Sequence, residues 1–443
     1  MSVTTPPRPG APRPAPPGPG PGQGPAPSTP AARPIGKARK RAVGPSLGAF
    51  PVANLVVLEV GLAIGLLIMA IEITLWPVSA GVLVIAMAIA FTRWRGRWVV
   101  EWTGLTLRYL ARSHTRVAVP PPDADNGVPA PEEKTVTGPE DARVALLRLV
   151  LPDLVVAHAK DHERRPLGLA WHDGAWTAVL MVEPAPALVT HVGAAPNLPF
   201  GALAPCLEDR GVVLDSIQVI WHCYPGSASL PASSPALNSY LEVLGPLPAA
   251  ARRSTLVAVR LDPRRCQNAV SERGGGVVGA HRALIGALSR VRNAMEGQGV
   301  PTRPLDVDEL LRAGISTANL QSVAGAQVKV GLRERWAGVT AGGVGHASYA
   351  VTAWPSRAAH NLNALTGVRA LSSTVTMSIS PTVDEGQVSL RGLVRVSART
   401  PSELAAAHTR LNQLSGKLGV TLTPLRGLQI PGLAATLPLG GTV

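Results

Sequence analysis

The sequence predicts a membrane-anchored protein of the α/β or α+β class, with an N-terminal two-helix transmembrane hairpin followed by a mixed-sheet cytosolic domain. Three observations carry this prediction. Two long apolar runs lie close together near the N-terminus, basic residues gather on their flanks, and strand-like and helix-like segments alternate through the rest of the chain. With 443 residues, 46% of them hydrophobic, the chain can bury a large core beside a membrane anchor.

Residues 1–48 are predicted to form a disordered, basic, proline-rich tail. The run PPRPGAPRPAPPGPGPGQGPAPSTP has no acidic residue and almost no apolar side chains to bury. Such a composition cannot offset the conformational entropy lost on folding. A PxxP pattern occurs in the run, but we favour a solvated tail over a ligand for a peptide-binding domain.

The strongest signal is a pair of apolar runs within residues 49–92, which we predict to be the transmembrane hairpin. The first run, 51–71, is long enough to cross a bilayer core, which takes about 20 residues. The second covers roughly 78–91 and is flanked by Trp76 and Trp94, which suit the two interfaces. A cleaved signal peptide would carry one short apolar region near the N-terminus, so a hairpin is the better interpretation.

Basic residues set the predicted orientation of this hairpin. Five of them lie within residues 33–41 and Arg93, Arg95 and Arg97 follow the second run, whereas no Lys or Arg lies between the runs. Cytoplasmic flanks of membrane spans are enriched in Lys and Arg. We therefore expect a two-pass protein of the inner (cell) membrane with its N- and C-termini in the cytoplasm.

The formal net charge of +14 is unevenly distributed. Residues 1–116 hold thirteen Lys or Arg against three Glu, a net of +10, and the rest of the chain holds only +4. A nucleic-acid-binding protein would carry a basic face interleaved with aromatic residues on its folded domain. The distribution favours membrane lipid as a partner and gives no support for nucleic acid.

Two polar residues inside the first apolar run, Asn54 and Glu59, are unusual in such a segment. Ionisable side chains in a span are costly and normally face protein or water. A proton or ion path would need further polar partners, and the second run offers only Ser79 and Thr92. We expect Glu59 to lie near the cytoplasmic third of the span or to pack against another subunit.

Residues 93–114 are predicted to form a basic amphipathic juxtamembrane helix, and residues 115–140 a proline-rich linker. One face of the helix carries aromatic and aliphatic side chains at spacings of four, three and four: Trp98, Trp102, Leu105 and Tyr109. This face would suit either the surface of an anionic membrane or a stalk that continues the second span.

Residues 141–443 are predicted to form the cytosolic α/β domain. Asp173-Gly174 stands between two β-rich runs and is a hairpin signal. The run 254–262 is apolar on both faces, as a buried central strand is. Further strands are predicted at 211–224, 347–354, 370–379 and 386–397.

Two helices are predicted in this domain. The first follows Gly274–Gly276, and its buried stripe is predicted to be Val277, His281, Leu284, Leu288, Val291 and Met295. The second opens with a capping box, Thr400 with Glu403, and with Pro401 at the first helical position. It is predicted to end at Gly416 and to bury Leu404, Leu411 and Leu414.

The sequence predicts no catalytic, cofactor-binding or metal-binding residue. Gly274–Gly276 lacks the Lys and Ser/Thr that a phosphate loop needs. His158 and His162 stand four residues apart, but a metal site needs further ligands. The cysteines show no CxxC spacing and are expected to be buried reduced thiols: Cys206, Cys223 and Cys266.

Two stretches look like active sites on first inspection. The acids of 306–309, DVDE, stand at a predicted helix start, where they complement the helix dipole. Residues 330–355 concentrate Arg, Trp, Glu and His in a chain that is poor in charge and aromatics. We interpret this stretch as a β-hairpin with a glycine turn and one covered face. Its exposed side chains are expected to contact partners: Arg333, Arg335 and Trp336.

The chain resembles EccE, a membrane component of the mycobacterial and actinobacterial type VII (ESX) secretion machinery. Beside the paired N-terminal spans, the resemblance rests on LGLAWHDGAWTAVLMVE, TLVAVRLDPRR with the glycine-led helix after it, RERWAGV with HASYAVTAWP, and LRGLQIPGLAATLPLG. These pieces cover about 50–112 and 165–440. The proline-rich tail is longer than is typical of the family.

This resemblance implies a non-enzymatic structural subunit of the protein secretion translocon, without cofactor or small-molecule substrate. EccE-like proteins assemble in the inner membrane with EccB, EccC and EccD, and EccC is the ATPase motor. The alternative from the sequence is a membrane-anchored glycosyltransferase-like or other enzyme with a cytosolic active site. Such an enzyme would need clustered carboxylates for a metal, and Asp262 with 306–309 comes nearest to such a cluster.

Overall fold

The computed structural model describes residues 46–47, 50–94, 97–118, 141–183, 198–225, 251–324, 329–354, 362–382 and 387–441. Nearly all of the predicted tail 1–48 and most of the predicted linker 115–140 lie outside the described residues. The disorder and the linker character assigned to them from the sequence therefore stay predictions.

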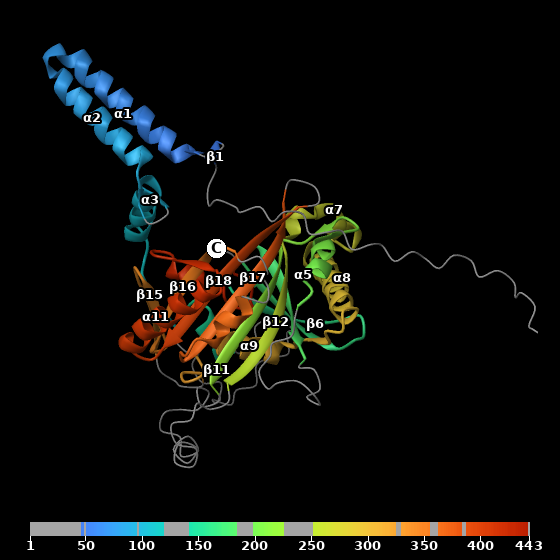
Figure 1. The fold of residues 1–443 in the computed structure, drawn as a ribbon. Helices are drawn as coiled ribbons and strands as arrows, with labels where there is room; N and C mark the ends of the chain where they lie inside the picture. The colour runs from blue at the N-terminus through green and yellow to red at the C-terminus, as the bar shows by residue number, and fades with distance from the viewer. Residues whose placement is uncertain are drawn as a thin grey trace, which may run out of the picture. The chain divides into compact units, whose positions relative to one another are not determined.

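The N-terminal hairpin consists of two apolar helices, α1 (Val52–Ile71) and α2 (Trp76–Phe91), joined by the turn η1 (Ile73–Leu75) (Figure 1). By length and composition, the helical stretches 52–71 and 73–91 could each cross a membrane. The second begins before the predicted residue 78 because Pro77 suits the first turn of a helix. A short ladder precedes α1: β1 (Ser46–Leu47) and β2 (Phe50–Pro51).

Small and polar residues hold α1 against α2. A Cβ added at Gly61 would lie 2.3 Å from the Cβ of Ala86, so the close approach of the two helices requires glycine there. Asn54 donates from Nδ2 to the carbonyl of Ala90 at 2.8 Å, and Ser79 donates to a backbone carbonyl of α1 at 2.8 Å. Asn54 therefore has its partner inside the hairpin.

The juxtamembrane segment is helical over a shorter range than predicted. Its first residues form a two-stranded ladder of β3 (Arg93–Trp94) and β4 (Arg97–Trp98), and α3 covers only Val99–Leu110. The run RWRGRWVV is rich in Trp and Val and contains a glycine, which favours strand and turn over helix. After α3 the chain enters the sheet as β5 (Thr115–Ala118).

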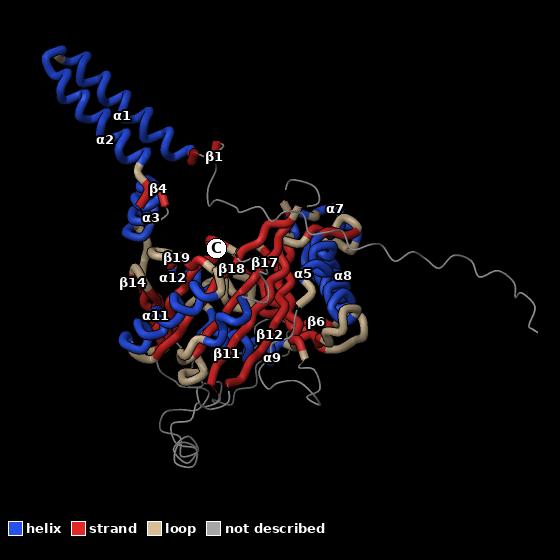
Figure 2. The backbone as a smooth tube through the Cα atoms, in the orientation of Figure 1, coloured by secondary structure: helices blue, strands red, loops and turns tan. Residues whose placement is uncertain are grey.

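A large antiparallel sheet forms the centre of the C-terminal domain (Figure 2). In spatial order the main path runs β5, β14 (Val330–Arg335), β15 (Gly338–Ala341), β16 (Val344–Ala353), β18 (Val388–Ala398), β17 (Ser372–Pro381), β11 (Ser216–Pro225), β12 (Ala251–Leu261), β8 (Ala175–Val182), β7 (Pro166–His172) and β6 (Val155–Lys160). Two further strands pair beside it, β13 (Thr302–Pro304) with β8 and β19 (Thr421–Pro424) with β16. A separate ladder joins β9 (Glu208–Asp209) to β10 (Val212–Val213).

The predicted mixed sheet is therefore wrong for the described residues, in which every strand pairing is antiparallel. Successive strands are joined mainly by hairpins, whereas parallel neighbours would need a long crossover for each step. Of the two classes predicted, the domain is α+β.

Helices cover both faces of this sheet. One face packs a core against α5 (Phe200–Leu203), α7 (Gln267–Glu272), α8 (Gly276–Glu296) and α11 (Pro401–Lys417). The opposite face packs a second core against α4 (Ala142–Leu147), α9 (Val307–Thr317) and α12 (Gln429–Ala434). Short 3-10 turns complete the described chain: η2 (Ala204–Leu207), η4 (Pro263–Arg265) and η5 (Leu365–Gly367).

The sheet is built from two copies of one topology. Read inward from opposite edges, β6–β7–β8–β12–β11 and β14–β15–β16–β18–β17 follow the same order, and β11 meets β17 at the centre. Each copy continues along the chain with a helix on the first face, a short strand beside its third strand, and a helix on the second face. These are α8, β13 and α9 in the first half, and α11, β19 and α12 in the second.

Individual hydrogen bonds repeat between the halves. Leu305 donates its N–H to the carbonyl of Val179 at 3.0 Å, and Leu425 donates to that of Ser348 at 2.9 Å, each just after the short strand. The turns at Asp173-Gly174 and Gly342-Gly343 both have positive φ at both residues, as a two-residue hairpin turn requires. The Asp-Gly hairpin predicted from the sequence is thus confirmed, and it has a glycine-only counterpart.

The predicted helices are confirmed with local corrections. Thr400 and Glu403 form the capping box of α11, which runs to Lys417 and leaves Leu404 and Leu414 only partly buried. The buried residues of α8 start at Gly279, and His281, predicted on the stripe, is only partly buried. Val277, placed on the stripe from its spacing, is 58% exposed in the first turn.

Candidate interaction site at the juxtamembrane junction

Residues 330–354 form three strands, β14, β15 and β16, and not the single hairpin with one covered face that we predicted. Burial alternates along β14, with Val330, Leu332 and Glu334 covered. Both faces of β16 are covered, since His346 and Ser348 are as inaccessible as Ala347 on the opposite face. The strand lies inside a sheet that carries helices on both sides, which short-range alternation in the sequence does not reveal.

Glu334 is the central residue of this region. Its carboxylate is fully buried and accepts an ion-paired hydrogen bond from Arg112 at 2.6 Å. Its other oxygen accepts the backbone N–H groups of Gln429 (2.7 Å) and Ile430 (3.0 Å), at the start of α12. Arg112 also donates to the carbonyl of Gly427 at 2.7 Å. One carboxylate therefore connects the juxtamembrane segment, β14 and α12.

Trp336, in the turn after β14, supports the aromatic face of α3. Its ring lies 6.0 Å from that of Trp102 and 5.1 Å, edge-on, from that of Tyr109. On its other side a Cβ added at Gly427, where φ is +70°, would come within 2.6 Å of the indole. Two residues of the predicted aromatic face, Trp102 and Tyr109, thus pack against Trp336 of the domain. We call Trp102, Tyr109, Arg112, Glu334 and Trp336 the junction cluster.

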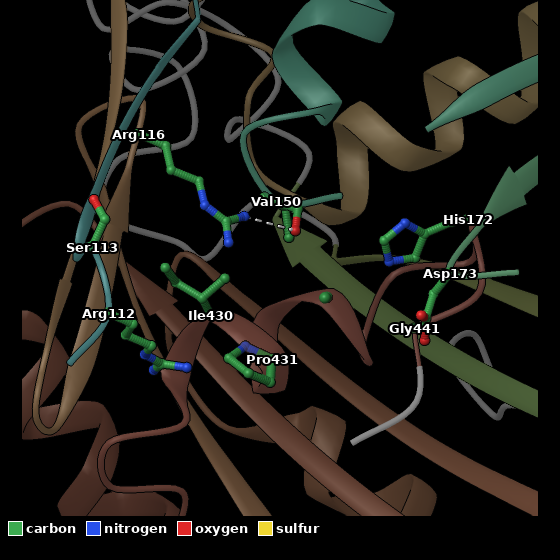
Figure 3. Close-up of a pocket in the computed structure, with 10 residues that line it drawn as sticks. Arg112, Ser113, Arg116, Val150, His172, Asp173, Ile430, Pro431 and Gly441 are labelled. Carbon is green, nitrogen blue, oxygen red and sulfur yellow. Dashed lines mark hydrogen bonds between the residues drawn. The ribbon is translucent and has the colours of Figure 1, made fainter. Parts of the chain in front are cut away.

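A pocket of about 200 Å³ opens beside this cluster (Figure 3). Figure 3 shows Arg116 extended toward Val150, whose carbonyl accepts from it at 3.4 Å, and the carbonyl of Leu149 accepts at 3.0 Å. Burial, followed by the charge of Arg112, lowers the pKa of Arg116. Because both arginines already have acceptors in the protein, the pocket is a weak ligand site. It is also smaller than the several hundred Å³ usual for small molecules.

A buried polar centre lies between the sheet and the helices of the second core. Arg395 on β18 is completely inaccessible and donates to the carbonyl of Thr317 and to the hydroxyl of Thr374 (3.0 Å). Among the described residues it has no carboxylate partner. His222 lies 2.9 Å from the same hydroxyl. Sequence reasoning missed this centre, whose only local signal is polar residues inside strands otherwise rich in Val and Ile.

Histidines in this centre are held neutral. Burial, and secondarily the charge of Arg395, lowers the pKa of His222 to about 3. The same two causes lower the pKa of His346, whose Nδ1 lies 2.9 Å from the hydroxyl of Ser397. Burial lowers the pKa of Arg395 itself to about 9. Low dielectric disfavours every charge here, so the centre is a structural polar network.

The carboxylates considered for an enzymatic reading are committed to structure. Asp306 caps α9 by accepting the N–H of Glu309 at 2.8 Å. Glu309 pairs with Arg303 at 2.7 Å, and Asp308 pairs with Arg143 at 2.6 Å. These arginines lower the pKa of both Glu309 and Asp308. The helix start predicted for DVDE is confirmed, and its acids face arginines on neighbouring elements.

The other residues weighed from the sequence lie apart from one another. His158 is on the exposed face of edge strand β6, and Asp262 caps η4 by accepting from Arg264. Gly274–Gly276 leads into α8 with positive φ at each glycine. The three cysteines are buried and free. In the part of the chain that the structure describes, no three His, Cys, Asp or Glu side chains gather as a metal site would require.

The chain is similar to one family of known proteins. A family model described as the "type VII ESX secretion system translocon, EccE" matches residues 249–351, from β12 to β16. The ESX-5 secretion system protein EccE5 of Mycobacterium marinum is 26% identical over 298 residues, which is 64% of this chain and 68% of that protein. The ESX-1 secretion system protein EccE1 of Mycolicibacterium smegmatis is 36% identical over 80 residues, 18% of this chain and 17% of that protein.

The family model and both relatives are EccE components of type VII (ESX) secretion systems, so the resemblance to EccE drawn from the sequence is confirmed.

Proposed function

We propose that the chain is a non-enzymatic structural subunit of the type VII translocon. It inserts in the inner membrane through the α1–α2 hairpin, with both termini cytoplasmic, and assembles with EccB, EccC and EccD-type subunits to export proteins. The observation that carries the proposal is the junction cluster. It connects the segment that leaves the apolar hairpin to the sheet domain through one partly buried ion pair and one edge-on aromatic contact.

A fixed junction suits a scaffold because a partner that holds the hairpin also positions the domain. Arg112 and Glu334 stand 222 residues apart in the chain. The Glu334 carboxylate is fully buried and the Arg112 side chain is 32% exposed. Opposite charges attract more strongly at such a partly buried position than in bulk water. The exposed Arg333 and Arg335 on β14 lie beside this junction and are proposed as contacts for a neighbouring subunit.

The alternative of a membrane-anchored enzyme has less support. Its nearest candidate carboxylates, Asp306, Asp308 and Glu309, each serve a helix cap or an arginine. Residues that act on a substrate would be expected to converge on a pocket. A turnover that is abolished by changing these three acids would favour the enzyme.

The test is purification of the tagged full-length chain from its own membranes in a mild detergent, followed by mass spectrometry. We expect EccB, EccC and EccD-type proteins to co-elute in one large species. As a matched pair, Arg333→Ala with Arg335→Ala should weaken that assembly, whereas Arg312→Ala, on the surface of α9, should not. Recovery of the wild-type chain alone, as a monomer, would contradict the proposal.

A further inference from the structure

The first candidate span carries one ionisable side chain that the hairpin does not use. Asn54, Gly61 and Gly65 of α1 are buried against α2. Each residue of an α-helix is rotated about 100° from the one before it. Glu59 is five residues after Asn54 and two before Gly61, so its side chain points about 140–160° away from the side of α1 that contacts α2. Its side chain is exposed, on the side of α1 that faces away from α2.

The surroundings of Glu59 on this outer face are entirely aliphatic. Its helical neighbours at three and four residues are Leu55, Val56 and Leu62, about half exposed, with Leu66 continuing the same face. Glu59 begins about 10 Å along the helix from Val52, at 1.5 Å per residue. In a bilayer a carboxylate at this depth would lie among acyl chains, where ionisable groups are costly and pair with protein.

Nothing in the described part of the chain serves as that partner. Glu59 makes no hydrogen bond or ion pair with the described residues, and the sequence from 51 to 92 contains no Lys, Arg or His. A second copy of the chain would present the same carboxylate and the same aliphatic side chains. Two ionised carboxylates would repel each other, so self-association would satisfy Glu59 only if one of the two took up a proton, whereas a basic partner pairs with the carboxylate as it stands.

We propose that the Glu59 face of α1 is a docking surface for a transmembrane helix of a different subunit, one that carries a basic side chain at the cytoplasmic third of the membrane. The aliphatic residues pack against that helix and the carboxylate pairs with its cation. In a dry environment this pair selects both the partner and its depth. The inference rests on the proposed membrane-subunit function and adds the face and the chemistry of the contact.

The experiment compares full-length wild type with Glu59→Lys, Glu59→Leu and Glu72→Lys, expressed at equal levels in a host that lacks the native gene. Glu72 lies exposed between α1 and α2 and serves as the matched charge-reversal control. Each tagged chain is extracted in mild detergent, and co-purified membrane subunits are quantified by mass spectrometry. Glu59→Leu removes only the charge and makes the span more apolar, so poor insertion cannot explain a loss.

We expect Glu59→Lys and Glu59→Leu to retain at most about a tenth of the wild-type partner subunits and Glu72→Lys to retain most of them. Wild-type recovery of partners by Glu59→Lys and Glu59→Leu would overturn this inference alone. A wild-type chain that elutes without partners would overturn the proposed function and this inference together. Capture of a differently tagged second copy that is lost with Glu59→Leu would also overturn it, in favour of self-association.

Discussion

The two halves of the sheet domain share one topology but bury different chemistry on the face that α9 and α12 cover. The first half places Val179 and Ala258 side by side in adjacent strands, and both belong to the second core. At the equivalent positions the second half places Ser348 and Arg395. At these two positions the first half is apolar and the second half is polar, although the first half also buries Arg260 on the same face, where it pairs with Asp215.

The outer strands differ in the same way. Val156 on β6 pairs with Ala170, and the equivalent of Val156 in the second half is Glu334, which pairs with Val339. Val156 is partly exposed at a free edge, whereas Glu334 is buried beneath the segment that comes from α3. Glu334 in the second half holds Arg112 of the juxtamembrane segment with its charge, whereas Val156 at the equivalent position offers only methyl groups.

The largest difference in stability between equivalent variants of the two halves is expected at Glu334 and Val156. Glu334→Ala leaves the guanidinium of Arg112 and the first N–H groups of α12 without their acceptor, which should lower the free energy of unfolding by about 3–5 kcal/mol. The equivalent change Val156→Ala removes two methyl groups and should cost about 1–2 kcal/mol. Denaturant titration of the purified chains, followed by tryptophan fluorescence, measures both. Equal losses would contradict the assigned role of Glu334.

Acid should have the next largest effect, through the buried histidines His222 and His346. The pKa of His222 is about 3 in the folded chain and near 6.5 when unfolded, so the unfolded chain takes up this proton first as the pH falls. The contribution of neutral His222 to the free energy of unfolding is complete above about pH 6.5 and is lost progressively toward pH 3. At pH 4.5 the loss is about 2–3 kcal/mol. His346 adds a loss of the same sign.

His222→Gln should therefore flatten the acid limb of a stability–pH profile, while His158→Gln on the exposed face of β6 should leave it in place. Thermal midpoints between pH 4 and pH 8 provide the measurement. An unchanged acid limb in His222→Gln would show that the buried histidine is not neutral in the folded chain.

A smaller effect is expected from the aromatic part of the junction cluster. Trp336→Ala removes the ring on which Trp102 and Tyr109 pack, with an expected cost of about 2–3 kcal/mol and earlier proteolysis after α3. Arg335→Ala, the exposed neighbour, should change stability by less than about 0.5 kcal/mol. Equal protease sensitivity in the two variants would count against packing of α3 on the domain.

The smallest effect tests the cap of α9 in the first half. Asp306→Ala should cost about 1 kcal/mol by losing the capping box, and Asp306→Asn should recover most of it because Asn also caps well. The thermal midpoint checks both variants. A loss in Asp306→Asn as large as in Asp306→Ala would point to a role for the charge itself.

Local signals made part of this structure predictable. The apolar runs, the Asp173-Gly174 turn and the capping box at Thr400 each depend on residues close in sequence, and each is found. The pair Arg112–Glu334 joins residues 222 positions apart, and Arg395 reaches Thr317 across 78 positions, so no local pattern reveals them.

The duplication was also hidden, because the halves conserve topology more than sequence. One trace of the duplication is visible in the sequence: VPTRPL at 300–305 resembles VTLTPL at 420–425. Each of the two segments follows a predicted helix. Each segment forms the short strand of its half, β13 or β19. Each ends in the leucine, Leu305 or Leu425, whose N–H donates the hydrogen bond that recurs between the halves. Alignment of these two segments would have been the signal for the repeat.

The central claim is that Glu334 of the second half holds the juxtamembrane segment on the sheet domain. Hydrogen–deuterium exchange over residues 99–118 of the full-length chain tests it most directly, in wild type, Glu334→Ala and the equivalent Val156→Ala. We expect exchange in this segment to accelerate at least tenfold in Glu334→Ala and to stay at the wild-type rate in Val156→Ala. Equal protection of the segment in Glu334→Ala and wild type would contradict the claim.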